Sequence, residues 1–389
     1  MSNVPKLRFK EFSRDWEEKI FKNIVKLQRG SSPRPIVKYI TKSENGVNWI
    51  KIGDISNGKN FINSTEEKIT KEGAKKSRKV DIGEIILSNS MSYGKPIILN
   101  IDGYIHDGWF VIREFENSFN KSYLLQVLGS EWIQKQYKRL AAGGVVNNIS
   151  SELVNSVKIN LPSKQEQEKI ALFLTSIDTK IEQLTKKEQL LQQYKKSVMQ
   201  KIFNQEIRFK ADDGSEFKDW EEKNLSSLCT IKKGSQLNKD TLTETGDYPA
   251  VNGGINPSGY TTQYNTEENT ITISEGGNSC GYVNFITTKF WSGGHNYSLQ
   301  DLKKSIENLY LFQYLKHNEN SIMSLRVGSG LPNIQKGAIS NFLVLIPCIE
   351  EQNKIANFLS SIDTKIEQTQ KQLESSKEFK KALLQQMFV

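Results

Sequence analysis

The sequence predicts a mixed α/β fold (α+β) in which two pseudo-symmetric globular modules are joined by a long antiparallel two-helix coiled coil. The first observation is a repeat: SIDTKIEQ at Ser176–Gln183 recurs letter for letter at Ser361–Gln368, which indicates two tandem halves. The second is an apolar residue every three or four positions around both copies, which is typical of a long helix in a coiled coil. The third is that the intervening segments mix β-like runs with Gly, Asn and Ser turns.

The N-terminal segment is repeated as well. Asp15–Lys19 is identical to Asp219–Lys223 at an offset of 204, whereas the two SIDTKIEQ copies lie 185 residues apart. The second half therefore has 19 fewer residues in its middle. We interpret the similar ends as a common scaffold that holds two different modules. Trp16 and Trp220 occupy equivalent places, so we expect them to pack within the scaffold.

Each module is expected to combine short strands with one helix. The first contains β-like runs at Trp49–Ile52, Glu84–Leu87, Pro96–Asn100 and Trp109–Ile112, then a helix-like stretch, Lys121–Arg139. The second contains runs at Thr270–Ser274, Tyr282–Thr287 and Tyr297–Leu299, then a helix-like Ile306–Lys316. An alternating strand closes each module, Val157–Leu161 or Phe342–Ile346, and the proline that follows marks a helix start.

The two long helices carry matching apolar stripes. The residues expected to pair the helices are Ile170, Leu174, Ile177, Ile181, Leu184 and Leu191 in the first, and Ile355, Leu359, Ile362, Ile366 and Leu373 in the second. The weak seam positions are Glu188, Lys195, Thr369, Ser376 and Lys380. About 40 helical residues make a rod of roughly 60 Å. The simplest partner for each stripe is the other helix; the alternative is that each stripe packs on its own module.

The order of the parts predicts the direction of the helices. The link Gln205–Asp219 is short, so the second module begins near the far end of the first helix. The second helix must then run back to pair, which makes the helices antiparallel. The N-terminal Leu7–Lys19 is expected near the end of the second helix. We place boundaries at 1–161, 162–205, 206–346 and 347–389, alternating module and helical spacer.

Composition restricts the function. The net charge is +9 with a pI near 9.1, which favours a polyanionic partner such as nucleic acid. Three cysteines far apart in the sequence suit a reducing, cytoplasmic location. No apolar run is long enough for a membrane span, and the N-terminus does not resemble a secretory signal. We find no P-loop, no Asn-Pro-Pro-aromatic methyltransferase motif and no zinc-ligand spacing, so we expect no catalytic residue, bound metal or cofactor in this chain.

This arrangement resembles the specificity (S) subunit of Type I restriction–modification systems. The resemblance is carried by Pro162–Ala171 with Ile177-Asp178, and by their repeat, Pro347–Ala356 with Ile362-Asp363. The runs Trp49–Ile55 and Tyr248–Ile255 are similar to runs in the recognition domains of that family. The resemblance covers essentially the whole chain.

The resemblance implies a non-catalytic DNA-reading subunit. Its two target recognition domains would each read one half of a split, asymmetric site in double-stranded DNA. The helix pair would set the unread spacer and dock two methyltransferase (M) subunits around one copy of this chain. Those subunits bind S-adenosylmethionine and methylate adenine N6, while added restriction (R) subunits cleave unmodified DNA with ATP and Mg²⁺. Two readers about 60 Å apart suit half-sites separated by one or two turns of B-DNA.

The candidates for DNA contact are polar, basic or aromatic residues on turns of the modules. Asn reads adenine and Arg or Lys reads guanine, whereas Lys and Ser mostly hold phosphates. In the first module they are Arg29, Ser31, Lys51, Lys75, Lys76, Arg78, Asn89, Ser90, Tyr93, Lys95, His106 and Trp109. In the second module they are Lys232, Lys233, Asn252, Tyr260, Asn278, Tyr282, His295 and Asn296. For each residue the alternative is a solvated loop or a side chain that supports the fold.

Two other functions stay open from the sequence. An interaction scaffold would bind proteins through both modules and dock partners on its helices, and its binding would lack the steep salt dependence of DNA binding. A free-standing nuclease or methyltransferase is disfavoured by the missing motifs.

Overall fold

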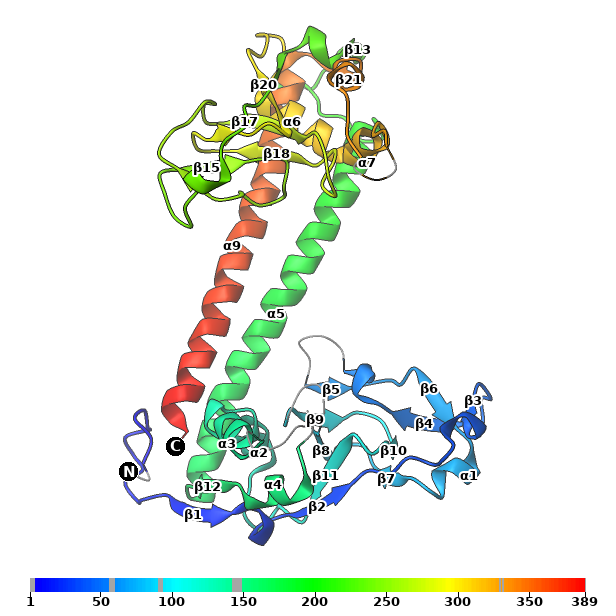
Figure 1. Ribbon diagram of the computed structural model, residues 1–389, viewed down its shortest axis with the longest axis vertical. Helices are drawn as coiled ribbons and strands as arrows, with labels where there is room; N and C mark the ends of the chain where they lie inside the picture. The colour runs from blue at the N-terminus through cyan, green and yellow to red at the C-terminus, as the bar shows by residue number, and fades with distance from the viewer. Residues whose placement is uncertain are drawn as a thin grey trace. The chain divides into compact units, whose positions relative to one another are not determined.

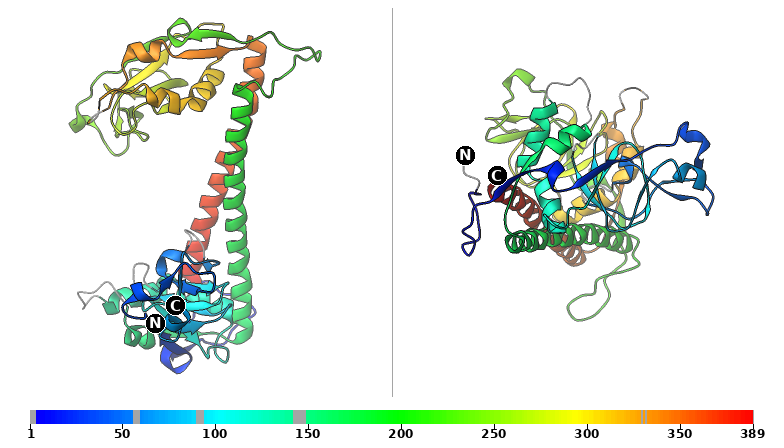
Figure 2. Two further views of the ribbon diagram at one scale, coloured as in Figure 1. Left: turned by 90° about the vertical axis from the view of Figure 1, so that its right-hand side faces the viewer. Right: turned by 90° about the horizontal axis from the view of Figure 1, so that it is seen from below.

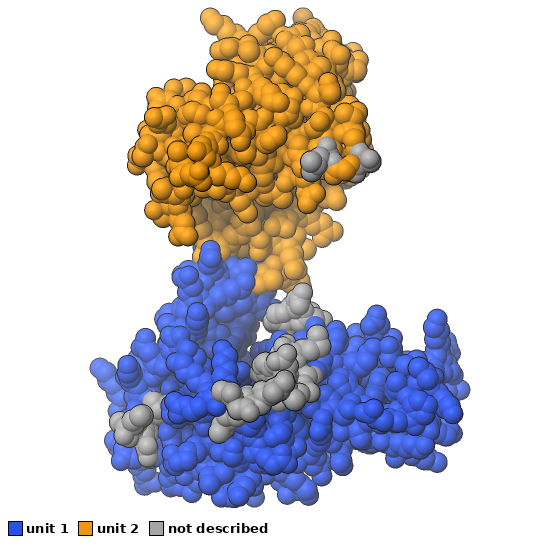
Figure 3. All heavy atoms as spheres, in the orientation of Figure 1, with its two compact units in different colours: residues 1–184, 372–389 blue, residues 185–371 orange. Residues whose placement is uncertain are grey.

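The computed structural model describes residues 4–55, 60–89, 94–141, 149–328, 330 and 332–388, apart from the side chains of residues 140 and 141. The chain forms two compact units, Met1–Leu184 with Gln372–Val389, and Thr185–Lys371 (Figure 3). The division passes through both long helices, so each unit holds one α/β module and part of each helix (Figure 1). The mixed α/β class is confirmed, whereas the four segment boundaries stay predictions.

The module of unit 1 contains two five-stranded sheets. One has the order β3–β6–β4–β10–β7, with β3 (Ile40–Thr41), β6 (Glu67–Ile69), β4 (Val47–Ile50), β10 (Gly103–Ile105) and β7 (Arg78–Val80). The other has the order β2–β11–β8–β9–β5, with β2 (Lys26–Arg29), β11 (Trp109–Arg113), β8 (Ile85–Ser88), β9 (Pro96–Leu99) and β5 (Phe61–Ile62). Helices α1 (Lys71–Ala74), α2 (Lys121–Leu128), α3 (Glu131–Ala141) and α4 (Ser151–Ser156) complete it.

Strand β11 is the second strand of its sheet and is apolar on both faces. Successive side chains of a strand point to opposite faces. Phe110 and Ile112 belong to the core shared with the helices, whereas Trp109 and Val111 belong to a second core between the sheets. This strand therefore anchors the loops at its ends, including the one just before Trp109.

The module of unit 2 is built on a four-stranded sheet, β14–β20–β17–β18, and a three-stranded sheet, β16–β15–β19. The strands are β14 (Thr230–Lys233), β20 (Asn296–Gln300), β17 (Thr270–Ser274), β18 (Val283–Ile286), β16 (Tyr260–Thr261), β15 (Tyr248–Val251) and β19 (Trp291–Ser292). Helices α6 (Asn308–His317), α7 (Glu319–Ser324) and α8 (Lys336–Ser340) complete it. Helix α6 covers one face of the larger sheet (Figure 2), where Tyr310 and Leu311 share a core with Ile271 and Ile273.

One predicted element is wrong in detail. The stretch Lys121–Arg139 was expected to be a single helix, but it forms α2 and α3 with a break between them. Gly129 ends α2, and the Ser130 hydroxyl accepts a hydrogen bond from the backbone N–H of Ile133 (3.4 Å). A serine that caps the next helix in this way is a stronger local signal than the apolar period that continues through it.

Both long helices form where the stripes predict them, as α5 (Lys164–Phe203) and α9 (Ile349–Met387). In unit 1, Ile170 and Leu174 at the start of α5 share a buried cluster with Leu383 and Met387 at the end of α9. In unit 2 the cluster joins the end of α5 to the start of α9. These contacts are those of antiparallel helices, and each cluster also includes the core of its module. Each stripe therefore packs both on the other helix and on its own module, which combines the two alternatives. A supercoiled heptad geometry stays a prediction.

The remaining pairing residues follow the same stripe. Ile177, Leu184, Ile355, Leu359, Ile362 and Leu373 are buried, and Ile181, Leu191 and Ile366 are half-buried. Two seam lysines are neutralised by the repeated aspartate. In unit 1, Lys380 of α9 pairs with Asp178 of α5 (2.5 Å), and Gln126 of α2 donates to the same carboxylate (2.8 Å). The equivalent trio of unit 2 is Lys195, Asp363 and Gln313, with distances of 2.6 and 2.8 Å.

The repeated Glu-Gln pair fastens the N-terminal segment and the module to α5. Glu166 is 1% exposed and accepts hydrogen bonds from Arg8 Nε (2.7 Å) and Trp16 Nε1 (3.3 Å). Gln167 accepts from the backbone N–H of Asn120 (2.8 Å), which is the N-cap of α2. The same contacts recur in unit 2 with Glu351, Arg208, Trp220, Gln352 and Glu307. The scaffold role predicted for the two tryptophans is confirmed.

Two further pairings confirm the scaffold at the ends of the halves. Strand β1 (Glu17–Ile20) pairs with β12 (Lys158–Leu161), and β13 (Glu221–Asn224) pairs with β21 (Leu343–Ile346), all antiparallel. Leu7 N donates to Gln386 O (3.0 Å), so the N-terminal segment does reach the end of α9.

Candidate nucleic-acid interface

The two modules differ in sequence but share one arrangement of loops, held by backbone hydrogen bonds around a glycine, which we call the loop frame. The backbone N–H of Gly30 donates to Trp109 O (2.8 Å), and that of Gly234 donates to Asn296 O (2.9 Å). Each glycine follows the first strand of its sheet, β2 or β14, and ends the similar runs LQRG and IKKG. Trp109 and Asn296 therefore hold equivalent positions, which the sequence did not reveal.

Parallel strand pairs confirm this equivalence. Strand β4 pairs in parallel with β10, and β15 pairs in parallel with β19. The backbone N–H groups of Ile149 and Ile334 close the frames on Asn89 O (2.7 Å) and Glu275 O (2.8 Å). Each module thus gathers three segments around its glycine: the loop after β2 or β14, the loop before β11 or β20, and the residue after β8 or β17.

Gly30 and Gly234 are required by close approach of backbone atoms. A Cβ at position 30 would lie 2.0 Å from His106 O, and one at position 234 would lie 2.2 Å from Gly293 O. Neither glycine has a positive φ, so the constraint is steric. The absence of a side chain lets the loops cross, which positions the residues on either side.

In unit 1 this frame brings four predicted residues together. Arg29 is exposed and its Nε donates to Asp107 O (3.1 Å), while Arg78 Nε donates to Arg29 O (3.2 Å). The Ser31 hydroxyl donates to Lys76 O (3.1 Å), and the Lys76 ammonium lies 4.8 Å from the Tyr39 ring centroid. The result is a rim with two guanidinium groups and an ammonium group on one side of the loop crossing.

Asp107, which is not among the residues predicted from the sequence, joins the parts of this rim. Its carboxylate accepts from the Ser32 hydroxyl (2.6 Å) and from Arg34 (3.3 Å). The Ser32 hydrogen bond is the main reason that the pKa of Asp107 lies below its usual range. The predicted residues were chosen for basic, amide or aromatic side chains, which excluded an aspartate. The available signal for Asp107 was its place between two basic segments.

His106 is half-buried at the loop crossing. The backbone N–H of Gly108 donates to its Nδ1 (2.6 Å). Burial lowers the pKa of His106 and outweighs the nearby Asp107 carboxylate, which acts in the opposite direction. A neutral imidazole accepts this hydrogen bond, so His106 fixes the loop that carries Asp107.

The other predicted residues of the first module are placed in different ways. Asn89 is 2% exposed and donates to Asp107 O (2.7 Å), and Trp109 is fully buried. Lys51 pairs with Glu67 (2.7 Å), Lys75 is exposed, and Lys95 is half-buried with a pKa lowered by burial. Ser90 and Tyr93 lie outside the described residues. Asn89 and Trp109 thus support the loops in the free protein, and DNA contact by any of these residues stays a prediction.

In unit 2 the corresponding rim is centred on Glu275, which is likewise not among the residues predicted from the sequence. Its carboxylate accepts from Lys233 Nζ (2.6 Å) and from the Tyr297 hydroxyl (3.1 Å), and His295 Nδ1 lies 3.6 Å away. Asn252 Oδ1 accepts from the backbone N–H of His295 (3.2 Å). Lys233 and His295 are exposed, so an ammonium group and an imidazole surround a carboxylate that orients them.

The remaining predicted residues of the second module lie around this rim or apart from it. Lys232 and Asn278 are exposed, whereas Asn296 is 1% exposed and donates to Ser292 Oγ (3.1 Å). Tyr260 is half-buried on β16, and Tyr282 lies with its ring centroid 4.0 Å from Lys316 Nζ. The frame therefore collects Asn252, Lys233 and His295 but not the two tyrosines.

Within the residues that the structure describes, no group of three His, Cys, Asp or Glu side chains is arranged to hold a metal ion. No helix in the described part of the chain combines the length and the apolarity that crossing a membrane requires.

Comparisons with known proteins agree with this architecture. The profile of the Type I restriction modification DNA specificity domain matches residues 13–193 and 217–375. A putative type I specificity subunit of Mycoplasma pneumoniae is 34% identical over 171 residues, which cover 43% of this chain and 45% of that protein. The chain thus matches less than half the length of this relative. The putative MjaX specificity subunit of Methanocaldococcus jannaschii is 26% identical over 98% of this chain and 95% of that protein.

Solved structures share the fold. The S subunit of a Type I restriction–modification system from M. genitalium has a TM-score of 0.69 at 18% identity, covering 99% of both chains. A chain from a structure describing assembly and conformational transition of the type I R-M system has a TM-score of 0.56 at 17% identity, covering 95% of this chain and 96% of that one. Because the profile matches both halves and most of the sequence, this chain belongs to the Type I restriction modification DNA specificity family.

Proposed function

We propose that this chain is the DNA-binding specificity subunit of a Type I restriction–modification complex. In this proposal each module reads one half of a bipartite, asymmetric site in double-stranded DNA. The chain itself is non-catalytic and binds no cofactor. In the cytoplasm, one copy assembles with two methyltransferase subunits, which use S-adenosylmethionine, and with restriction subunits that use ATP and Mg²⁺.

The observation that carries the proposal is that the same loop frame occurs in both modules but holds a different rim in each. Each module holds an exposed cation, Arg34 or Lys233, on an orienting carboxylate, Asp107 or Glu275, but the other residues around these carboxylates differ. Identical rims would favour two identical half-sites. Different rims on a common frame favour two different half-sites, because base edges are distinguished by the donors and acceptors that face them.

Adenine methylation mapping tests this function directly. A host expressing the chain with its neighbouring methyltransferase subunit should show N6-methyladenine at a gapped two-part motif, and a host lacking the chain should not. A contiguous motif, or methylation that is unchanged without the chain, contradicts the proposal. The alternative scaffold function would then explain a stable complex that lacks sequence-dependent methylation.

The rims make the DNA test residue-specific. Lys76→Ala should weaken binding to all sequences and reduce the slope of log K against log[salt] by about 1, because one phosphate contact is lost. Asn278→Ala should instead alter the preference for one half-site. Lys10→Ala is the matched control, since Lys10 is exposed in the N-terminal segment, which is fastened to α5 and α9 and not to the loop frame of unit 1. Equal salt slopes for Lys76→Ala and the unmodified chain would remove Lys76 from the proposed interface.

A further inference from the structure

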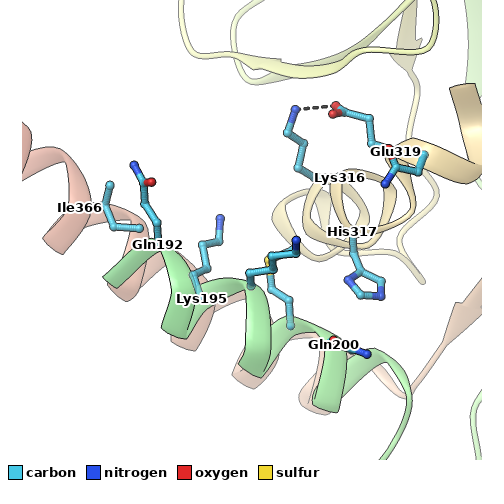
Figure 4. Close-up of a pocket in the computed structure, with 10 residues that line it drawn as sticks. Gln192, Lys195, Gln200, Lys316, His317, Glu319 and Ile366 are labelled. Carbon is cyan, nitrogen blue, oxygen red and sulfur yellow. Dashed lines mark hydrogen bonds and ion pairs between the residues drawn. The ribbon is translucent and has the colours of Figure 1, made fainter. Parts of the chain in front are cut away.

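A groove of about 350 Å³ opens in unit 2 between α5 and the helices α6 and α7 (Figure 4). Its lining includes Lys195, Lys196 and Gln200 of α5 and Lys316 of α6. Met199 and Ile366 add an apolar part. The groove therefore combines cationic and amide groups with apolar surface at the place where the long helices meet the module.

The charges in this groove are unequally compensated. Lys195 pairs with Asp363 (2.6 Å), and Lys316 pairs with Glu319 (2.5 Å). Lys196 is exposed, and its ammonium makes no hydrogen bond or ion pair with the residues that the structure describes. His317 adds no charge near neutral pH, because burial lowers its pKa. The groove thus presents one uncompensated cation.

Unit 1 shows which chemical group contacts the equivalents of Lys196 and Gln200, and we call the place beside these two side chains the corner of the groove. The residues equivalent to Lys196 and Gln200 at the repeat offset are Lys381 and Gln385 of α9. Gln385 Nε2 donates to Glu131 Oε2 (2.6 Å), in the first turn of α3. The pKa of Glu131 is lowered chiefly by its hydrogen bond to Lys135 and then by Gln385, with a smaller contribution from Lys381. A carboxylate at the start of a helix therefore occupies this corner in unit 1.

Unit 2 does not supply that carboxylate itself. Glu319 begins α7, but its carboxylate accepts from the backbone N–H of Val283 (2.9 Å) and from Lys316. Figure 4 shows the Glu319 side chain directed toward Lys316 and away from Gln200. The Gln200 amide makes no hydrogen bond within the described part of the chain. The corner has the same lysine and glutamine as in unit 1, without their acidic partner.

We propose that this groove of unit 2 binds an Asp or Glu side chain from the first turn of a helix in the methyltransferase partner. The inference rests on the proposed function and adds a docking site to it. Lys196 and Gln200 bind the carboxylate, and the half-buried Ile366 packs against the apolar part of the same helix. A negative residue in the first turn is also favoured by the dipole of the helix that carries it.

The surroundings favour a protein partner over DNA. A phosphodiester has no apolar part to cover Ile366, which is half-buried. Of the residues predicted to contact DNA, Tyr282 adjoins the groove through Lys316, and none belongs to the lining that the structure describes. The groove also lies on α5, α6, α7 and α9 rather than on the loop frame of the rim.

The test compares two charge-reversed variants of the full-length chain in its complex with the methyltransferase. Lys196→Glu, alone and with Gln200→Glu, places negative charge in the groove. Lys187→Glu is the control, because nine residues separate Lys187 from Lys196 and place it on the opposite side of α5. We expect the dissociation constant for the methyltransferase to rise at least tenfold for Lys196→Glu, and within twofold for the control. The difference should shrink as salt is raised.

A chemical cross-link provides a second measurement that does not depend on a variant. A zero-length carbodiimide should join Lys196 of the unmodified chain to a partner carboxylate, which mass spectrometry would locate on a helix. Unchanged subunit affinity for Lys196→Glu, or the absence of that cross-link, overturns the inference. Loss of DNA affinity with unchanged subunit affinity also overturns it and assigns the groove to nucleic acid.

These outcomes are separate from failure of the proposed function. If the unmodified chain binds neither the methyltransferase nor a gapped DNA site, the proposed function itself fails. If it binds both and Lys196→Glu behaves like Lys187→Glu, the function stands and the docking site is wrong.

Discussion

Replacing Glu166 by glutamine tests whether the repeated Glu-Gln pair stabilises unit 1. The Glu166 carboxylate is 2% exposed and the Arg8 side chain 12% exposed, and two of their contacts measure 2.7 and 2.8 Å. Removing one partner of a buried ion pair costs about 3–5 kcal/mol, because the other charge is left uncompensated. Glutamine keeps one acceptor for Arg8, so we expect a loss near the lower limit, about 3 kcal/mol.

Hydrogen exchange is the appropriate assay, because it reports each unit of the chain separately. A loss of about 3 kcal/mol corresponds to roughly 100-fold faster exchange of amides protected by opening of unit 1, at about 1.4 kcal/mol per factor of ten. The peptides to follow are those of α5 near Glu166 and of β1. Peptides of unit 2 should keep their rates, so the same sample contains its own reference.

Two variants control the interpretation. Glu168→Gln changes the same charge at an exposed position two residues away and should leave exchange unchanged. Glu351→Gln removes the equivalent carboxylate in unit 2, where Arg208 is 23% exposed, and should accelerate exchange there by a smaller factor. If Glu166→Gln accelerates exchange less than fivefold, the ion pair does not stabilise unit 1 as the burial implies.

Three further predictions concern single sites. Gly234→Ala should destabilise unit 2 by about 2 kcal/mol, measured by hydrogen exchange, because its Cβ meets Gly293 O. Asp363→Asn should lower the free energy of unfolding of unit 2 by about 2 kcal/mol, because it leaves Lys195, which is 16% exposed, without its partner. Adding Lys195→Met should restore part of this loss. If the effects of the two substitutions are fully additive, the pairing is contradicted. Since His106 has a lowered pKa, the unfolded chain binds the proton more readily. The protection factors of unit 1, which correct each exchange rate for the intrinsic rate at that pH, should therefore fall as pH falls below about 6.5, and His106→Gln should abolish that dependence.

The helices and the scaffold could be predicted from the sequence because their determinants are local and repeated. An apolar stripe with a period of three or four residues, interrupted at Glu188 and Lys195, predicts a helix of 40 residues without knowledge of its partner. The internal repeat then supplied the equivalent positions in the second half. The strands rich in β-branched and aromatic residues, such as β11 and β17, were also located within one or two residues.

The loop frame could not be predicted, because it depends on backbone contacts between segments far apart in the sequence. The parallel pairs β4–β10 and β15–β19 join short strands with weak periodicity. The orienting carboxylates Asp107 and Glu275 were missed for a related reason: their role follows from which cations surround them after folding. Conversely, Asn89 and Asn296 fit a base-reading composition but are buried in the structure.

The frame explains how the similar ends and different middles of the two halves are compatible with one function. Backbone hydrogen bonds, a glycine crossing and a parallel strand pair place few demands on side chains, so the rim residues can differ without loss of the loop positions. The scaffold has the opposite property, because Glu166, Asp178 and their repeats each satisfy specific charged partners. The rim residues can therefore be substituted as long as Gly30, Gly234 and these carboxylates are kept. Substitution of the rim residues alone should alter the DNA sequence that is bound and leave the free energy of unfolding unchanged.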